Sequence, residues 1–237
     1  MISCIAALVV VVFGLTAVQN SFHWKHTLPT GISSPPIMST LILDAGHGGE
    51  DGGAVSLSGT AESSINLAIA LKLDDLLGFY GAPHILLRRE DISLHDPDAS
   101  TLREKKVSDL HNRVAAVNAA QNATLLSIHQ NSYPNGKYHG AQVFFAPTDG
   151  SQALAQHIQA ALRSALQPEN SRECKQIPST VYLMNHIHCP GVLVECGFLT
   201  NQLEEAMLRE TIYQRKLAAV LTSAWLTSQP GFPQVEQ

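Results

Sequence analysis

Short apolar runs and longer amphipathic segments alternate along most of the chain. Short apolar runs between turn-forming residues are typical of buried strands, whereas apolar residues that recur every three or four positions indicate helices. Ile65, Ile69 and Leu73 show the helical spacing. The pattern predicts strands at Thr40–Ala45, His84–Leu87, Thr124–Ile128, Gln142–Ala146 and Gly191–Glu195, and helices at Glu62–Leu77, Val107–Ala120, Ser151–Leu166 and Glu210–Thr227.

Strands that read as continuous apolar runs, separated by helices, favour a parallel sheet that is buried on both faces. We therefore predict the α/β class, with a single domain whose largely parallel twisted sheet carries helices on both faces. An N-terminal apolar segment precedes this domain. The expected boundaries are a signal or membrane-anchor segment at 1–20, a linker at 21–38, the α/β domain at 39–228 and a C-terminal tail at 229–237.

The N-terminus has no charged side chain from Met1 to Trp24, and Ile2 to Val18 is almost wholly apolar. This length is the lower limit for spanning a bilayer and slightly long for the apolar part of a signal peptide. A buried core helix is the alternative, but the polar, proline-rich sequence that follows argues against it. We expect a membrane anchor or a signal, which would place the domain outside the cytoplasm.

Composition excludes several classes of protein. A net charge of −5 over 237 residues gives no electrostatic reason to bind nucleic acid or an anionic membrane surface. The four cysteines, Cys4, Cys174, Cys189 and Cys196, form no CxxC pair, which argues against a structural zinc knuckle. Cys174 and Cys189 could form a disulfide in an oxidising compartment, and their spacing does not decide the matter.

Three side chains that can bind metal or carry protons stand at the ends of predicted strands: His47, His129 and Glu195. In open α/β sheets, ligands bind at the carboxyl ends of the strands, and the start of a following helix, here Glu62, lies at the same edge. Two imidazoles and one carboxylate are a common zinc set in hydrolases, with one position left for water. A carboxylate that is not a ligand suits the general base, and Glu195 is the candidate.

Simpler interpretations stay open for each residue. A histidine at a strand end can be structural, and the chain has 11 histidines. Glu62 could serve only the helix dipole. The loop "GHGGEDGG" could instead cradle phosphate, but it lacks GK[ST] and a GxGxxG pattern, and its two acids would repel an anion. A rival metal cluster is His186, His188 and Cys189, whose two imidazoles would share one side of a strand, although no acid stands beside them.

Five motifs together resemble the zinc-dependent N-acetylmuramoyl-L-alanine amidases of the amidase-3 type. They are "LDAGHGGEDGGAV"; Glu62 with "INLAIALKL"; "LLRRED", similar to TRxxD with Leu87 in place of Thr and with Arg88 and Asp91 retained; "LHNRVAAVN" followed by "LLSIHQNS"; and "PGVLVECGFLTN". The resemblance covers Leu41 to Leu226. It implies that His47, Glu62 and His129 hold Zn²⁺ and that Glu195 is catalytic. Asp51 and Asn131 lie near enough in sequence to these ligands to contact them or the substrate.

Softer motifs, including "TLREKKVSDLHNRV" and "VYLMNHIHCPG", and the short layout resemble the germination-specific amidases of the spore cortex. That likeness implies removal of stem peptides from peptidoglycan for muramic-δ-lactam formation, with a downstream deacetylase and a lipoprotein partner. It implies a place outside the cytoplasm, such as the space between the forespore membranes. A vegetative autolysin, a zinc peptidase acting within the stem peptide and a non-catalytic wall-binding protein are the alternatives.

Overall fold

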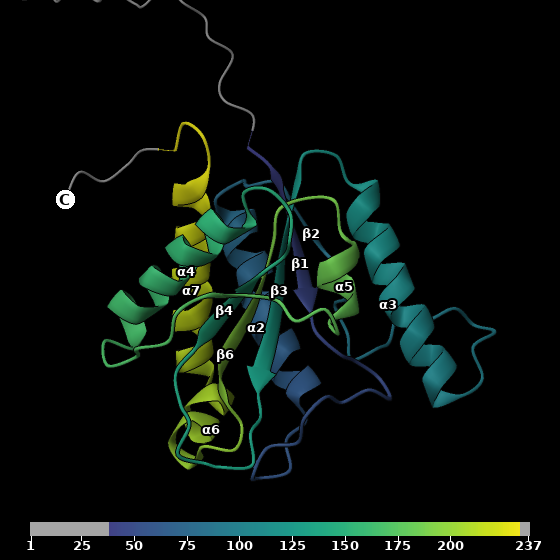
Figure 1. The fold of residues 1–237 in the computed structure, drawn as a ribbon, viewed down its shortest axis with the longest axis horizontal. Helices are drawn as coiled ribbons and strands as arrows, with labels where there is room; N and C mark the ends of the chain where they lie inside the picture. The colour runs from purple at the N-terminus through teal and green to yellow at the C-terminus, as the bar shows by residue number, and fades with distance from the viewer. Residues whose placement is uncertain (1–37, 233–237) are drawn as a thin grey trace, which may run out of the picture. The chain divides into compact units, whose positions relative to one another are not determined.

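Six strands form one mixed sheet in the order β2-β1-β3-β6-β4-β5 (Figure 1). The computed structural model describes residues 38–232. The strands are β1 (Thr40–Ala45), β2 (His84–Leu86), β3 (Ala123–Asn131), β4 (Gln142–Phe145), β5 (Lys175–Gln176) and β6 (Gly191–Phe198).

Strands β2, β1, β3 and β6 are mutually parallel, whereas β4 runs antiparallel to β6 and β5 runs parallel to β4. The predicted α/β fold with a largely parallel sheet is therefore confirmed. The reversal of β4 was not predicted, because an apolar run has the same composition in either direction. In the register of β3 and β6, His129 lies opposite Glu195. This pairing brings two predicted site residues next to each other at the end of the sheet.

Helices cover both faces of the sheet, as predicted (Figure 1). Successive strand residues point to opposite faces, so Leu41 and Leu43 of β1 pack in a core with α2, α4 and α7, while Ile42 packs with α3 and α5. The helices are α2 (Glu62–Phe79), α3 (Leu102–Ala119), α4 (Ser151–Leu166), α5 (Tyr182–His186), α6 (Gln202–Arg209) and α7 (Thr211–Ser228).

Helix α3 begins at Leu102, five residues before the predicted start at Val107, which was wrong. A capping box sets this start. The Thr101 hydroxyl accepts a hydrogen bond from the Glu104 N–H (3.2 Å), and the Glu104 carboxylate accepts one from the Thr101 N–H (2.9 Å). The short elements α5, α6 and β5 were also missed, because so few residues show no clear periodicity.

The three cysteines in the described part of the chain, Cys174, Cys189 and Cys196, are free thiols. The disulfide considered for Cys174 and Cys189 is therefore not formed. Within residues 38–232, no helix has the length and apolarity that a bilayer crossing requires. The expected N-terminal anchor at 1–20 and most of the linker lie outside the described residues. The boundaries at 39 and 228 stay predictions.

Candidate metal centre

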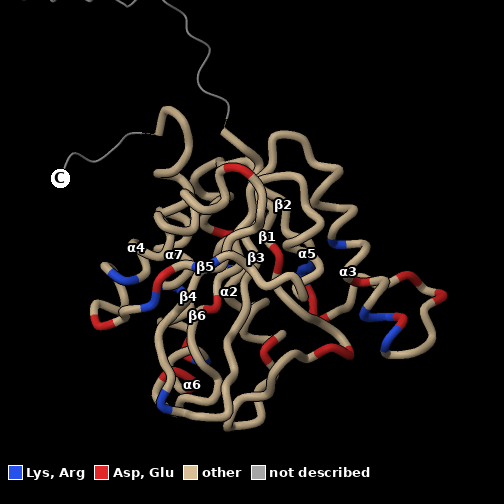
Figure 2. The backbone as a smooth tube through the Cα atoms, in the orientation of Figure 1, with Lys and Arg blue, Asp and Glu red and all other residues tan. Residues whose placement is uncertain are grey.

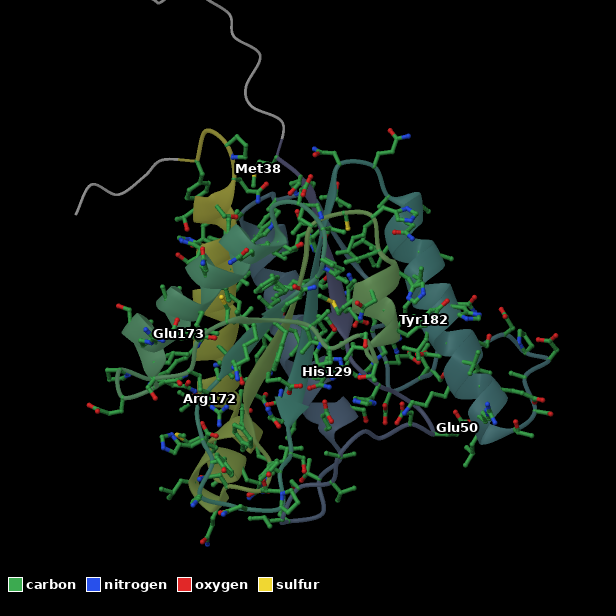
Figure 3. The ribbon with its side chains drawn as sticks, viewed as in Figure 1. Met38, Glu50, His129, Arg172, Glu173 and Tyr182 are labelled. Carbon is green, nitrogen blue, oxygen red and sulfur yellow. The ribbon has the colours of Figure 1, made fainter. Side chains whose placement is uncertain are left out.

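The structure brings His47, Glu62 and His129 together at the carboxyl edge of the parallel strands. Each offers one ligand atom, and these atoms all lie within 4.8 Å of one another. Glu62 lies between the two imidazoles, because its Oε2 is 3.4 Å from Nε2 of His47 and its Oε1 is 3.0 Å from Nδ1 of His129. Figure 3 shows His129 at the lower end of β3. The spacing of these donors suits a single metal ion.

The rival cluster does not form. His186 is the last residue of α5, and His188 lies in the turn that follows, so the expectation that both share one side of a strand was wrong. In residues 38–232, the His47–Glu62–His129 group is the one set of three such side chains that could hold a metal ion.

Glu62 is 4% exposed and is fixed by several donors. Its Oε1 accepts hydrogen bonds from the Gln130 N–H (3.1 Å) and the Asn66 amide (3.3 Å), and its Oε2 accepts one from the Ala54 N–H (3.0 Å). Asp51 Oδ2 lies 3.1 Å from Nδ1 of His47 and orients that ring. The predicted contact of Asp51 with a candidate ligand is therefore present. No side-chain hydrogen bond of Asn131 is found among the described residues.

Two glycines of the loop give the candidate ligands their room. A Cβ on Gly46 would lie 2.1 Å from Nε2 of His129. A Cβ on Gly53, whose φ is +69°, would lie 2.6 Å from Oε2 of Glu62. Both contacts are far shorter than a van der Waals separation, so a side chain at either position would displace a candidate ligand. The loop thus packs against imidazole and carboxylate groups, and the carboxylate of Glu62 argues against the phosphate-cradle alternative.

A buried arginine holds this loop from the β2 side. Arg88, which is 2% exposed, donates hydrogen bonds to the carbonyl oxygens of Ala45 (2.9 Å), Gly46 (3.1 Å) and Ser63 (2.9 Å). Asp91 accepts a hydrogen bond from the Gly49 N–H (3.1 Å). The two residues retained from the TRxxD-like motif therefore fix the backbone that carries His47.

A second buried arginine, Arg113 of α3, holds the loop from the other side. It pairs with the buried carboxylate of Asp44 and with Asp109 (2.8 Å). It also donates to the carbonyl oxygens of Ala45 (3.1 Å) and His47 (2.8 Å). Sequence reasoning assigned no role to Arg113, although it stands in the quoted "LHNRVAAVN" motif.

The charges around His47 favour a cation. Burial disfavours its protonation, but the hydrogen bonds and charges of Asp51 and Glu62 outweigh that and raise the pKa of His47 to about 9. Burial acts to raise the pKa of Glu62, yet the two imidazoles hold it well below its usual range. The site therefore attracts positive charge strongly. The carboxylates that stabilise a proton on His47 would also stabilise a divalent metal ion.

Glu195 is the fourth predicted residue, and it lies beside this group. Its Oε2 is buried and has no hydrogen-bond partner among the described residues. Burial, aided by the charge of Glu62 and opposed by those of His129 and His47, raises the pKa of Glu195 to about 7. A buried carboxyl oxygen without a partner is costly to stability, so the position of Glu195 argues for a chemical role.

Glu195 faces a cavity of about 280 Å³. Its polar wall includes the two imidazoles, and its opposite wall comes from α3 and α5. Figure 3 shows Tyr182 of α5 across from His129. The α5 wall was not anticipated from the sequence; it consists of Tyr182, Leu183 and Met184 of α5, with Val181 just before the helix. The cavity therefore presents both polar and apolar side chains to a substrate.

A parallel sheet whose strand ends gather two imidazoles and two carboxylates beside a cavity defines a candidate metal-dependent hydrolase. Comparison with known proteins narrows this class. The family model described as N-acetylmuramoyl-L-alanine amidase matches residues 41–225. The chain therefore belongs to the amidase-3 family, and it is an N-acetylmuramoyl-L-alanine amidase that acts on peptidoglycan.

Individual relatives agree with this assignment. The chain is 36% identical to the germination-specific N-acetylmuramoyl-L-alanine amidase of Bacillus subtilis over 203 residues, which cover 85% of this chain and 82% of that protein. It is 28% identical to the amidase LytC of the same organism, covering 80% of this chain and 35% of LytC. Among solved structures, it resembles the CwlD amidase of Clostridioides difficile in complex with the GerS lipoprotein, with a TM-score of 0.75 and 38% identity, covering 80% of this chain and 98% of that one.

Proposed function

We propose that the protein is a zinc-dependent amidase that cleaves the bond between N-acetylmuramic acid and L-alanine. In this proposal His47, Glu62 and His129 hold Zn²⁺, and Glu195 is the catalytic residue. The observation that carries it is the convergence of three candidate ligands, within 4.8 Å of one another, beside Glu195, whose buried Oε2 lacks a hydrogen-bond partner among the described residues.

The donor set fits zinc. Two imidazoles and one carboxylate are a common protein ligand set of catalytic zinc sites, and such sites keep one position open. When bound, zinc polarises the carbonyl under attack and makes a water molecule more acidic. Asp51 holds the far nitrogen of His47, as partners of metal-bound histidines commonly do.

Glu195 suits the proton transfers. It takes a proton from the attacking water and returns one to the departing alanine nitrogen, so that the amide bond breaks without forming a strong base in the cavity. A pKa raised to about 7 lets the carboxyl accept and release a proton near neutral pH. The position of Glu195 opposite His129 on adjacent strands keeps it beside the candidate metal ligands.

The biological role we propose is removal of stem peptides in the spore cortex, which prepares the glycan for a deacetylase and for muramic-δ-lactam formation. The 36% identity to a germination-specific amidase supports this role over that of a vegetative autolysin such as LytC, at 28%. A lipoprotein partner is part of the proposal, because the similar CwlD amidase was solved with one. We further propose that residues 1–20 are a signal or anchor and place the domain outside the cytoplasm.

Metal content tests the ligand set. We expect the purified protein to hold about one zinc per chain, and the Glu62→Gln and His129→Ala variants to hold far less after dialysis. The Glu195→Gln variant should keep its zinc and lose peptidoglycan cleavage. Full zinc content in the first two variants would contradict the assignment of the ligands.

Complementation tests the cortex role. The chain would be expressed in a Bacillus subtilis strain that lacks its germination-specific amidase, and spore cortex would be analysed for muramic-δ-lactam. We expect the wild-type chain to restore the lactam and Glu195→Gln to leave it absent. An active amidase that restores no lactam would favour a vegetative role.

A further inference from the structure

The cavity of the candidate site has one accessible positive side chain, Lys106. The basic residues among those that line the cavity are Lys106 and Arg113. Arg113 has a side chain only 2% exposed and is occupied by the loop and by two carboxylates, whereas Lys106 is 56% exposed. The side chain of Lys106 is therefore accessible to a substrate.

Lys106 stands close to the candidate ligands. Its Nζ lies 3.1 Å from Oδ2 of Asp51, and the same oxygen lies 3.1 Å from Nδ1 of His47. Because both atoms lie 3.1 Å from the same oxygen, Nζ of Lys106 is at most twice 3.1 Å from Nδ1 of His47. A substrate group bound by Lys106 would sit within a residue or two of the bond that is cleaved.

Its neighbour Lys105 lies outside the cavity. Lys105 pairs with Glu50 at the outer side of the loop and does not line the cavity. Figure 3 shows Glu50 beside the first turns of α3, and Figure 2 shows basic and acidic residues mixed at this end of the helix. The helix dipole disfavours cations here, and Glu50 and Asp51 offset it. The two lysines share this local environment, so Lys105 is a matched control for Lys106.

The stem peptide of the substrate has a carboxyl group that Lys106 could bind. Beyond its first alanine, the stem peptide of peptidoglycan continues with a D-glutamate whose carboxyl group is either free or amidated. The cavity is lined by the carboxylates of Asp44, Asp51, Asp109 and Glu195; Arg113 pairs with Asp44 and Asp109, whereas Asp51 and Glu195 are not paired with it. Like charges repel an anionic peptide in such a place, and a nearby ammonium group counteracts the repulsion.

We propose that Lys106 binds the first free carboxylate of the stem peptide beyond the scissile bond and thereby makes the enzyme prefer substrates in which that carboxyl is not amidated. The inference rests on the proposed function and names the substrate that the site selects. Lys106 exchanges its contact with Asp51 for one with the substrate. A half-exposed ion pair contributes little to stability, so the exchange costs little.

The test uses two synthetic muropeptides that differ only in this group: a disaccharide with a stem peptide that carries free D-glutamate, and the same compound amidated there. Release of the peptide is followed with the zinc-loaded wild type and with Lys106→Met, Lys106→Arg and Lys105→Met. For the free acid, we expect Lys106→Met to raise KM about tenfold, the effect of losing one charge-assisted hydrogen bond. Its kcat should change little, and Lys106→Arg should restore most of the affinity.

For the amidated compound, all four proteins should have similar KM values, and Lys105→Met should match the wild type on both substrates. An equal loss on both substrates would overturn the proposal, because Lys106 would then act through Asp51 and His47. Unchanged KM values in Lys106→Met would overturn it as well. A wild-type protein that releases no peptide from either compound would instead contradict the proposed function.

Discussion

Replacing Arg113 with methionine removes the guanidinium group that joins the glycine-rich loop to the sheet. The substitution leaves Asp44, which is 1% exposed, without its opposite charge. It also removes a hydrogen-bond donor from the carbonyl oxygen of His47 and one of the two donors, with Arg88, to that of Ala45. Ser127 still donates to Asp44 at 2.6 Å, but a hydroxyl does not neutralise a buried carboxylate.

Breaking a buried ion pair by removing one partner costs about 3–5 kcal/mol. Domains of this size have an unfolding free energy of about 5–15 kcal/mol, so the variant should fold at 25 °C with much of its stability gone. Since each kcal/mol shifts the melting temperature of such a domain by about 2–4 °C, we expect a decrease of roughly 6–20 °C.

Urea unfolding at pH 7, followed by circular dichroism with excess chelator, measures this loss without a contribution from zinc binding. The matched control is Arg89→Met. Arg89 also pairs with a buried carboxylate, that of Asp74, but its own side chain is 63% exposed and His84 Nε2 also lies 3.2 Å from Asp74, so the expected loss is smaller, about 1–2 kcal/mol. The reasoning would be refuted if Arg113→Met unfolded within about 1 kcal/mol of the wild type, or if both variants lost the same amount.

Three further predictions follow from single contacts. Gly46→Ala places a Cβ 2.1 Å from the His129 ring, so the zinc affinity should fall at least about tenfold when it is measured by competition with a chelating dye. In the control Gly78→Ala the nearest contact of the new Cβ is at 3.9 Å, and zinc affinity should equal that of the wild type. Glu195 must be ionised to accept a proton, and its pKa is raised to about 7. A bound cation lowers that pKa, so kcat/KM should rise with pH and reach its midpoint at or below about pH 7. A kcat/KM that falls as the pH rises towards 7 would contradict the role of Glu195 as the base. Thr101→Ala removes the capping box of α3 and should lower the unfolding free energy by about 1 kcal/mol in urea, and no change would mean that the helix starts without it.

The strand ends explain why much of the candidate site could be predicted. His47, His129 and Glu195 follow apolar runs, and parallel strands that are buried on both faces end at the same edge. Their convergence with Glu62 in the structure follows from that rule. Their roles as ligands and as catalytic base stay predictions until the metal content and activity of the variants are measured.

Other features depend on packing that local sequence does not encode. Arg113 lies in the middle of α3, and its contact with His47 exists because α3 packs over the loop after β1. The direction of β4 depends on its pairing with β6, which an apolar run does not specify. The α5 wall belongs to a helix of only five residues, whose helical form depends on its neighbours in the fold.

The central claim is that this site hydrolyses the bond between N-acetylmuramic acid and L-alanine with a bound zinc ion. Mass analysis of the products tests it most directly, after purified peptidoglycan is digested by the zinc-loaded protein with and without chelator and by Glu195→Gln. We predict peptide-free glycan and stem peptides with a new alanine amino terminus, formed by the wild type without chelator alone. Cleavage within the stem peptide, or cleavage that persists in chelator or in Glu195→Gln, would contradict the claim.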